Sequence, residues 1–458
     1  EALTGTRMDP LPEERRRGVT MDLHFAALPL PGIGIAGVVD VPGHEDLVRT
    51  MVAGATGIDV VLLVIAADEG IMPQAREHLA VVEQLRIKSG IPVITKADLV
   101  ESAWLSLVTA EVAKWLGNSP VAFSPPIATS VPSGRGIEAL RVEIGRLLST
   151  GQTVRAPDDL ARLPIDRAFS LAGVGTVVTG TAWSGVFRVG EAVTVLPGGQ
   201  NSRIRSLGRH GLPVEVSAPG ERLAVGLAGI PREDLGRGQV LVRADDPWEV
   251  TSVVDARIAL LAGAPRPLTH HVRIRVHLGT LEVMARVNLQ EPIAPGASGY
   301  VRLVLEEPTV TRGGDRLVLR SYSPVAVIGG GEVVDPLPPP GRPEWSPGLD
   351  SPNASERFSA LLARRHNGIS ERQLPVLLGV APTQVARVVT AAEVVAAGPV
   401  LVSTSQILNA QAAAVGAVHA YQARHAAEPG MPTQTLRQEV RRSGPAGVAA
   451  IARLVEAG

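Results

Sequence analysis

The sequence contains no cysteine, few aromatic residues and almost no net charge. The absence of cysteine excludes disulfides and thiolate metal sites, and it fits a reducing cytosol. A formal net charge of -1 creates no global field that attracts nucleic acid, so any RNA contact must come from local patches. Because only 3% of the residues are aromatic, we expect arginine contacts to an RNA backbone rather than base stacking.

The chain also lacks the patterns that direct a protein to a membrane. It opens EALTGTRMDP, without the basic and then apolar segments of a signal peptide, and it has no run of about twenty apolar residues. We therefore expect a cytoplasmic protein. With 458 residues, 45% of them hydrophobic, the chain is long enough for about three or four domains with cores of their own.

Lysine is scarce, and this bears on nucleotide binding. Only three of the 44 basic residues are lysines, at positions 88, 96 and 114, and none of them lies in a Gly-Lys-Ser/Thr motif. That motif ends the phosphate loop of nucleoside triphosphatases, where the lysine reaches the β and γ phosphates. Evidence for a nucleotide site must therefore come from other motifs.

Hydrophobic patterns divide the chain into an α/β part, a β part and a helical tail. Up to about residue 150, Val/Ile-rich runs alternate with helical patterns, which predicts an α/β domain with a parallel sheet. After a polar linker, short strands punctuated by Gly and Pro predict two or three β-barrel domains. The strand runs account for two barrels, at residues 164–246 and 249–336.

The tail follows a Pro-rich stretch at residues 335–348. Residues 369–380 and 381–392 predict two short helices joined by a tight turn, and residues 394–403 predict a β-hairpin. This order is typical of a winged helix, which we place at 345–408, with part of a second one at 409–458. Nucleic-acid binding and a solvated helix face explain its basic residues equally well: Arg357, Arg364, Arg365 and His366.

Residues 40–44 (DVPGH) follow an apolar strand and carry groups suited to a triphosphate. Asp40 would emerge at the carboxyl end of the strand, where ligands bind in open α/β sheets, and could hold Mg²⁺ through a water. Gly43 would let its backbone N–H approach the γ-phosphate, and His44 would orient the attacking water. Upstream, Thr20 would give a hydroxyl to Mg²⁺ and a backbone N–H to the γ-phosphate. A plain strand-to-helix turn is the alternative for DVPGH.

A second motif, residues 95–98 (TKAD), predicts a loop that binds guanine. Asp98 can accept hydrogen bonds from both N1–H and N2–H of guanine, a pair of donors that adenine lacks. The stem of Lys96 can lie over the base, and Thr95 begins the motif. Ser130 and Val131 lie where a further base-contact loop is expected, although alanine is usual at the position of Val131.

Together these motifs resemble the translational GTPases, in which a GTP-binding domain precedes two β-barrels. Within that group the chain resembles the selenocysteine-specific elongation factors (SelB) in three features. Thr95 replaces the usual asparagine, SYSPVAVIGGGEVVDP closes the second barrel at 321–336, and winged helices extend the C-terminus. Such proteins carry a phosphate loop of the form GHVDHGKT just before a stretch like EALTGT. We therefore expect the sequence to begin downstream of that loop and to stop before the last winged helix.

The resemblance implies a GTPase that binds GTP or GDP with Mg²⁺. It would deliver selenocysteinyl-tRNA to the ribosome at recoded UGA codons and hydrolyse GTP there with the help of His44. The C-terminal winged helices would bind the selenocysteine insertion hairpin of the mRNA. The resemblance also implies a monomer without membrane contacts.

The same resemblance implies an aminoacyl pocket between the GTP-binding domain and the first barrel. Arg167 and Arg222 replace an acid and an asparagine of elongation factor Tu, and Phe25 replaces a histidine. Two arginines suit an anionic selenolate, and we expect both to lack a neutralising partner when serine occupies the pocket. Two ordinary barrel-surface arginines are the alternative. The expected pocket residues are Phe25, Asp166, Arg167, His210 and Arg222.

Two other interpretations fit the sequence. A GTPase of the elongation factor Tu type shares the GTP-binding motifs and the barrels, but winged helices would not be expected to follow. A domain unable to bind nucleotide could instead be a scaffold for a nucleic-acid-binding tail. The missing lysine favours the scaffold, whereas Asp40, His44, Lys96 and Asp98 disfavour it. The residues upstream of Glu1 would discriminate between these interpretations.

Overall fold

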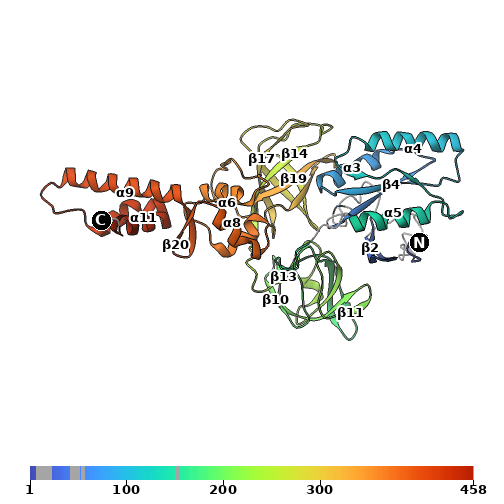
Figure 1. Ribbon diagram of the computed structural model, residues 1–458, viewed down its shortest axis with the longest axis horizontal. Helices are drawn as coiled ribbons and strands as arrows, with labels where there is room; N and C mark the ends of the chain where they lie inside the picture. The colour runs from blue at the N-terminus through green and yellow to red at the C-terminus, as the bar shows by residue number, and fades with distance from the viewer. Residues whose placement is uncertain (7–22, 42–51, 53–56, 151–154, 457–458) are drawn as a thin grey trace.

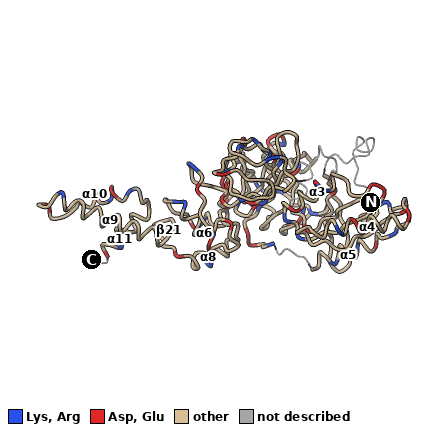
Figure 2. The backbone as a smooth tube through the Cα atoms, turned by 90° about the horizontal axis from the view of Figure 1, so that it is seen from above, with Lys and Arg blue, Asp and Glu red and all other residues tan. Residues whose placement is uncertain are grey.

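The protein is described by a computed structural model that covers residues 1–6, 23–41, 52, 57–150 and 155–456. Its parts form an elongated row, with the α/β domain at one end, two β-barrels in the middle and the last helices at the other end (Figure 1). The predicted combination of an α/β domain, β-barrels and C-terminal helices is confirmed. Acidic and basic residues are interspersed over the described part of the chain, consistent with the small net charge (Figure 2).

A parallel sheet forms the centre of the α/β domain. β4 (Ser89–Thr95) pairs with β3 (Val60–Ala66), β5 (Ala122–Phe123) and β6 (Ile127–Ala128). Five successive residues of β4 are buried, as expected for a parallel strand covered on both faces. The helices that cover it are α3 (Pro73–Gln84), α4 (Ser102–Leu116) and α5 (Ile137–Thr150). The loops after the parallel strands therefore emerge at one edge of the sheet.

An antiparallel hairpin precedes the parallel sheet. β1 (His24–Leu30) and β2 (Gly34–Asp40) pair along their whole length. Gly34 closes the turn with a φ of 114°, a conformation that favours glycine. Leu28 is fully buried in the same hydrophobic cluster as Ile144 of α5. Packing under α5 thus holds the hairpin beside the sheet.

Seven antiparallel strands form the first β-barrel. The sheet closes because β10 pairs with both β12 and β9. Its core is lined by valine, isoleucine and leucine side chains around the fully buried Phe187. The strands are β7 (Arg162–Leu171), β8 (Gly175–Thr181), β9 (Ala192–Leu196), β10 (Gln200–Arg209), β11 (Leu212–Val214), β12 (Arg222–Leu227) and β13 (Val240–Arg243).

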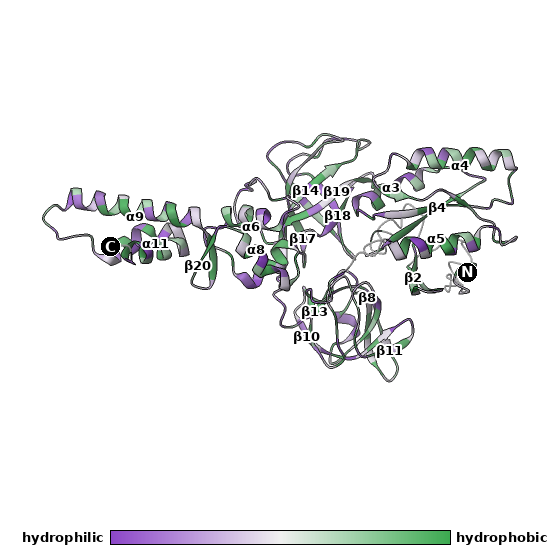
Figure 3. Ribbon diagram, viewed as in Figure 1, coloured by the Kyte–Doolittle hydropathy of each residue, from purple (hydrophilic) through white to green (hydrophobic). Residues whose placement is uncertain are grey.

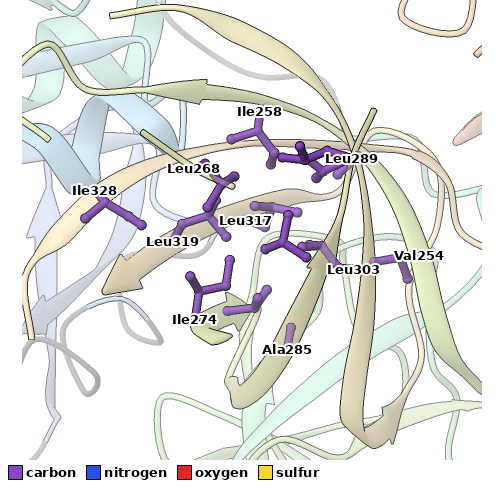
Figure 4. Close-up of a cluster of buried hydrophobic side chains, with 14 of the residues drawn as sticks. Val254, Ile258, Leu268, Ile274, Ala285, Leu289, Leu303, Leu317, Leu319 and Ile328 are labelled. Atoms are coloured by element: carbon purple, nitrogen blue, oxygen red, sulfur yellow. The ribbon is translucent and has the colours of Figure 1, made fainter. Parts of the chain in front are cut away.

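The second β-barrel is a closed ring of six antiparallel strands in the order β14-β17-β16-β15-β18-β19. Side chains at alternate positions of most strands point inwards, and Val254 and Ile258 of one strand lie in the same buried cluster as Leu303 and Leu317 of others (Figure 4). The strands are β14 (Thr251–Leu260), β15 (Arg273–Leu278), β16 (Leu281–Asn288), β17 (Ser298–Thr309), β18 (Arg316–Ser321) and β19 (Val327–Asp335).

Three helices and a hairpin follow the barrels. The last two helices and the hairpin lie in the segments where the sequence predicted two short helices and a hairpin, whereas the first helix was not predicted. The Asn353 side chain caps the first helix by accepting a hydrogen bond from the Ser355 backbone N–H at 2.9 Å. Gly379 ends the second helix with a φ of 66°. The elements are α6 (Ala354–Ala363), α7 (Leu374–Leu378), α8 (Val385–Ala391), β20 (Val394–Ala397) and β21 (Val400–Ser403).

A second helical unit continues directly from this hairpin. Ser403 and Gln406 form a capping box that starts α9 (Thr404–Arg424). α10 (Thr433–Glu439) and α11 (Gly444–Glu456) follow, and among the described residues no wing strand comes after them. A boundary between residues 408 and 409 would fall inside α9, because this helix is continuous from residue 404. The start of α9 is therefore the better division.

Hydrophobic residues are concentrated in the strands and on the helix faces that pack against them (Figure 3). Among the described residues, no single helix is long and apolar enough to cross a membrane. Within that described part of the chain, only the segments Glu371–Leu378 and Pro382–Ala391 reach that length and composition together, and they are bent by 114°.

Buried charges fasten the tail to the second barrel. Arg364 at the end of α6 donates to Asp335 at 3.1 Å and also to Asp255. Arg365 donates to Asp335 at 2.7 Å, and Arg302 donates to Asp255 at 2.7 Å. Both aspartates are fully buried. The interpretation of Arg364 and Arg365 as a nucleic-acid surface or a solvated helix face is therefore wrong, because barrel carboxylates hold both of them.

A second charged cluster joins the two barrels. Arg162 of β7 donates to both carboxylate oxygens of Asp315, at 2.6 and 2.7 Å. Arg312 donates to Asp159 at 3.1 Å, and its backbone N–H donates to Asp315 at 2.9 Å. Burial raises the pKa of Asp315, but the charges and hydrogen bonds of Arg162 and Arg312 together outweigh it and lower that pKa overall. These contacts fix the orientation of the barrels relative to each other.

Candidate functional sites

The two predicted base-contact loops lie together at the carboxyl edge of the parallel sheet. β4 and β6 are parallel neighbours, so the segments that follow them emerge side by side. The Ala97 backbone N–H donates to the Thr129 carbonyl at 3.1 Å and ties the loops to each other. Ser130 is buried, whereas Val131 is 68% exposed. The structure thus joins two motifs that lie more than thirty residues apart in the sequence.

Lys96 occupies a constrained position in this loop. Its φ of 56° lies in the left-handed region, which is uncommon for a residue other than glycine. Its Nζ donates to Asp68 at 3.0 Å and to Glu69 at 3.2 Å, and these hydrogen bonds raise the pKa of Lys96. Neither carboxylate was predicted from the sequence. The only signal was their place in the ADEG turn directly after β3, the strand beside β4.

The remaining residues of this loop leave a carboxylate accessible. Asp98 is exposed, and the Thr95 hydroxyl lies 3.5 Å from the Ile65 carbonyl. Trp104, at the start of α4, donates its indole N–H to the Ala67 carbonyl at 2.9 Å and remains 49% exposed. The loop can therefore offer an acceptor for two N–H groups of a purine, with a fixed lysine stem beside it.

Asp40 is the one predicted phosphate-side residue that the structure places. It ends β2, paired with His24 at the start of β1, and it is partly buried. Carboxylate oxygen is the ligand type that Mg²⁺ prefers, so Asp40 fits a metal-binding role. Thr20, Gly43 and His44 lie outside the described residues, and their positions relative to Asp40 are not part of the structure.

Three of the predicted aminoacyl-pocket residues meet between the hairpin and the first barrel. The Arg222 guanidinium carbon lies 3.2 Å from the centre of the Phe25 ring. Arg222 also donates twice to Asp166, once at 3.1 Å and once over a shorter distance. Thr179 donates to the same carboxylate at 2.7 Å. A cation, an aromatic ring and a carboxylate therefore form one cluster across the domain boundary.

The other two predicted pocket residues differ in position. Arg167 follows Asp166 on β7 and donates to the Leu23 carbonyl, just before β1. It therefore reaches the same boundary between the hairpin and the barrel. His210 lies in the turn between β10 and β11, exposed and with a φ of 50°. No hydrogen bond or ion pair of the described residues links His210 to the other four.

The charge state of this cluster corrects one expectation. We expected both arginines to lack a neutralising partner in the absence of an anionic ligand. For Arg222 this is wrong, because Asp166 neutralises it, and the Asp166 side chain is only 7% exposed. An anion that enters the cluster must therefore share Arg222 with Asp166.

Comparisons with known protein families match three segments of the chain. Residues 1–201 match the "Elongation factor Tu GTP binding domain" and residues 175–242 match "Elongation factor Tu domain 2". Residues 255–340 match the "Selenocysteine-specific elongation factor, beta-barrel domain".

Several curated proteins are similar over most of this chain. A protein from Desulfomicrobium baculatum named "Selenocysteine-specific elongation factor" is 42% identical over 342 residues, which cover 74% of this chain and 53% of the relative. A protein of the same name from Methanocaldococcus jannaschii is 32% identical over 355 residues, covering 73% of this chain and 75% of the relative. The chain spans about half the length of the Desulfomicrobium relative.

Solved structures agree with these matches. A crystal structure of a bacterial selenocysteine-specific elongation factor, EF-Sec, aligns with a TM-score of 0.78 and 26% identity, covering 95% of this chain and 72% of that one. The elongation factor SelB from Methanococcus maripaludis, in complex with the GTP analogue GppNHp, aligns with a TM-score of 0.62 and 27% identity. That alignment covers 69% of this chain and 73% of the SelB chain.

Proposed function

The chain belongs to the selenocysteine-specific elongation factors, a family of translational GTPases, and we propose that it binds GTP and delivers selenocysteinyl-tRNA to the ribosome at recoded UGA codons. GTP hydrolysis on the ribosome would then release the aminoacyl-tRNA. Such a role places the protein in the cytoplasm, where its ribosome partner lies, and a single copy of the chain would suffice for it.

The observation that best supports this proposal is the pair of loops joined by Ala97 and Thr129. The exposed Asp98 would accept N1–H and N2–H of guanine, and the fixed stem of Lys96 would cover one face of the base. Thr95, Ser130 and Val131 would complete the contacts with the base. Because adenine offers no matching pair of donors, this loop would select GTP over ATP.

We assign the phosphate side of the site to Thr20, Asp40, Gly43 and His44. Asp40 and Thr20 would hold Mg²⁺, which neutralises phosphate charge when it is bound. The Gly43 backbone N–H would bind the γ-phosphate, and His44 would position the water that attacks it. The partly buried carboxylate at the end of β2 supports the place of Asp40 in this set.

We further propose that the cluster around Arg222 receives the aminoacyl group. Phe25 offers an apolar wall, while Arg222 and Arg167 offer guanidinium donors that suit an anionic selenolate. Asp166 orients Arg222. His210 is a weaker candidate, since it lies in an exposed turn.

For the mRNA hairpin we assign the C-terminal winged-helix units as the binding region. Arg364 and Arg365 are excluded from this contact because they are bonded to barrel aspartates. Exposed arginines remain on the later helices, for example Arg424 and Arg437. Contacts to the RNA backbone through such residues would depend strongly on salt.

Two binding measurements on the full-length protein test the proposal. Competition between GTP and ATP tests the guanine loop, and equal binding of the two nucleotides would contradict it. Binding of selenocysteinyl-tRNA and seryl-tRNA in the GTP state tests the substrate. A protein that prefers GTP but binds both tRNAs equally would be a translational GTPase without the proposed selectivity.

A further inference from the structure

A cavity of about 630 Å³ lies where the α/β domain, the second barrel and the tail meet. Its walls come from the end of α3, from strands β14 and β19, and from the segments around α6 and α7. Small-molecule sites typically have volumes of roughly 300–1,000 Å³ and often lie between domains. The cavity is therefore of a size that suits a small ligand.

Three guanidinium groups of the cavity wall lie around a single carboxylate, Glu332 of β19. Arg316, at the start of β18, donates to one Glu332 oxygen at 2.7 Å. Arg86, just after α3, lies 3.5 Å from the same oxygen. The third group is Arg357 of α6, whose charge also interacts with that of Glu332. The α/β domain, the second barrel and the tail thus contribute one guanidinium group each.

These charges are not balanced by the rest of the wall. Arg357 donates to the backbone carbonyls of Ser351 and Leu378, at 2.8 and 2.9 Å, and no described hydrogen bond joins it to a carboxylate. Arg316 and Arg357 are both partly buried, and this burial lowers the pKa of each guanidinium group. A desolvated cation with too few anionic partners favours binding of an anion.

The other charged residues of the wall have partners other than Glu332 and the three arginines around it. Arg257 forms an ion pair with Asp350 at 3.2 Å. Glu83 accepts a hydrogen bond from the Ser119 hydroxyl at 2.7 Å. The wall therefore has a net positive charge, because its four arginines outnumber its three carboxylates. The arginines are Arg86, Arg257, Arg316 and Arg357, and the carboxylates are Glu83, Glu332 and Asp350.

We propose that this cavity binds a small phosphorylated ligand through Arg86, Arg316 and Arg357. Phosphate oxygens match the fork of a guanidinium group and would supply the missing negative charge. Because the three arginines come from three parts of the chain, the ligand binds best when these parts have the arrangement seen here. Binding therefore stabilises that arrangement. This inference does not depend on the proposed delivery of aminoacyl-tRNA.

The test uses inorganic phosphate as the probe and thermal unfolding of the full-length protein as the readout. Phosphate is raised while sodium chloride keeps the ionic strength constant, with and without saturating GDP and Mg²⁺. We expect phosphate to raise the unfolding midpoint of the wild type under both conditions, because the nucleotide site is separate. Arg316→Gln should weaken the apparent affinity by about tenfold or more, the effect of losing one hydrogen bond to a charged group. Arg387→Gln, at an exposed position of α8, is the matched control and should respond as the wild type does.

Two results would overturn the proposal. One is a phosphate response of Arg316→Gln equal to that of the wild type. The other is a wild-type response no larger than that to chloride. Binding of a short RNA without a terminal phosphate tests whether the cavity binds the phosphates of an RNA backbone instead of a small ligand. If that RNA binds in an Arg316-dependent manner while inorganic phosphate has no effect, the cavity contacts an RNA backbone and the small-ligand proposal is wrong.

Discussion

The ammonium group of Lys96 lies 3.0 Å from the carboxylate of Asp68, and this contact joins the turn after β3 to the base-contact loop after β4. Both side chains are more than one-third exposed, so the pair contributes little to the stability of the whole fold. Its effect is local. Together with Glu69, Asp68 limits the rotamers of Lys96 and holds its stem in one place.

We predict that Asp68→Asn combined with Glu69→Gln weakens GDP binding by about two- to fivefold, because Lys96 must then be ordered by the base alone. The thermal midpoint should remain close to that of the wild type. The loss of affinity relative to wild type should shrink at high salt, since salt screens exposed pairs. Glu111→Gln on the exposed face of α4 serves as the control. Unchanged GDP affinity in the double variant would show that the two carboxylates do not position Lys96.

The guanine loop gives a second prediction. Asp98→Asn should shift the preference from guanosine towards xanthosine nucleotides, because an amide can donate to the additional carbonyl oxygen of xanthine. Loss of the hydrogen bonds to a charged acceptor should reduce GDP affinity by about 1.5 to 3 kcal/mol. Competition between GDP and XDP for the variant measures both effects. A variant that still prefers GDP by the wild-type ratio would remove Asp98 from base recognition.

The third prediction concerns hydrolysis. His44→Ala should leave GTP binding nearly intact and slow ribosome-stimulated hydrolysis by about 10²- to 10⁴-fold, the usual effect of losing a positioned catalytic group. Single-turnover hydrolysis on ribosomes measures the chemical step separately from nucleotide binding. An unchanged single-turnover rate would exclude His44 from the mechanism.

The fourth prediction concerns the joint between the second barrel and the tail. Asp255→Asn removes the charge that neutralises Arg302 and Arg364, both of which are buried. We expect the free energy of unfolding to fall by about 3 to 5 kcal/mol, because buried guanidinium groups lose their partner. Chemical denaturation measures this change. Asp245→Asn, on an exposed loop, should change stability by less than about 0.5 kcal/mol. Equal stability of the two variants would mean that the buried cluster does not hold the tail.

The same cluster illustrates what the sequence can predict. The strands, the helix–turn–helix and the hairpin at residues 394–403 follow from local periodicity and turn residues, so they could be predicted. Arg364 and Asp255 are 109 residues apart, and no local pattern indicates that they pair. In the sequence Arg364 looks like any basic residue at a helix end, which explains why it was assigned to an accessible surface. The tertiary fold, and not the local sequence of the helix, determines which residue pairs with Arg364.

The candidate sites also contain some residues that local motifs could predict and others that they could not. The position of Asp98 beyond a strand of the parallel sheet could be predicted because a short motif follows an apolar run, whereas Asp40 ends a strand of the antiparallel hairpin. Asp68 could not be predicted, because its role depends on the left-handed backbone of Lys96 and on the adjacency of β3 and β4. Likewise, no neutralising partner of Arg222 could be predicted from the sequence, since Asp166 reaches it only when β7 and β12 both pair with β8.

If this last site receives the aminoacyl group, as proposed above, charge would select between selenocysteine and serine. A thiol ionises near pH 8.5, and a selenol is more acidic, so selenocysteine is largely an anion at neutral pH while serine is neutral. An arginine about 4 Å from the selenolate contributes a gross attraction of roughly 4 kcal/mol at an effective dielectric constant near 20. Asp166 opposes part of this attraction. The proposed selectivity would therefore require that Arg222 and Arg167 outweigh Asp166.

We therefore predict that Arg222→Asn combined with Arg167→Asp lowers the preference for selenocysteinyl-tRNA over seryl-tRNA. Removal of Arg222 loses the attraction and also leaves Asp166 unpaired beside the selenolate, so repulsion adds to the loss. Arg222→Asn with Asp166→Asn removes the repulsion and should recover part of the preference. Arg205→Asn, on an exposed position of β10, is the control. Dissociation constants for both aminoacyl-tRNAs in the GTP state decide the matter. A ratio within about twofold of wild type, under roughly 0.4 kcal/mol, would show that these arginines do not select the substrate.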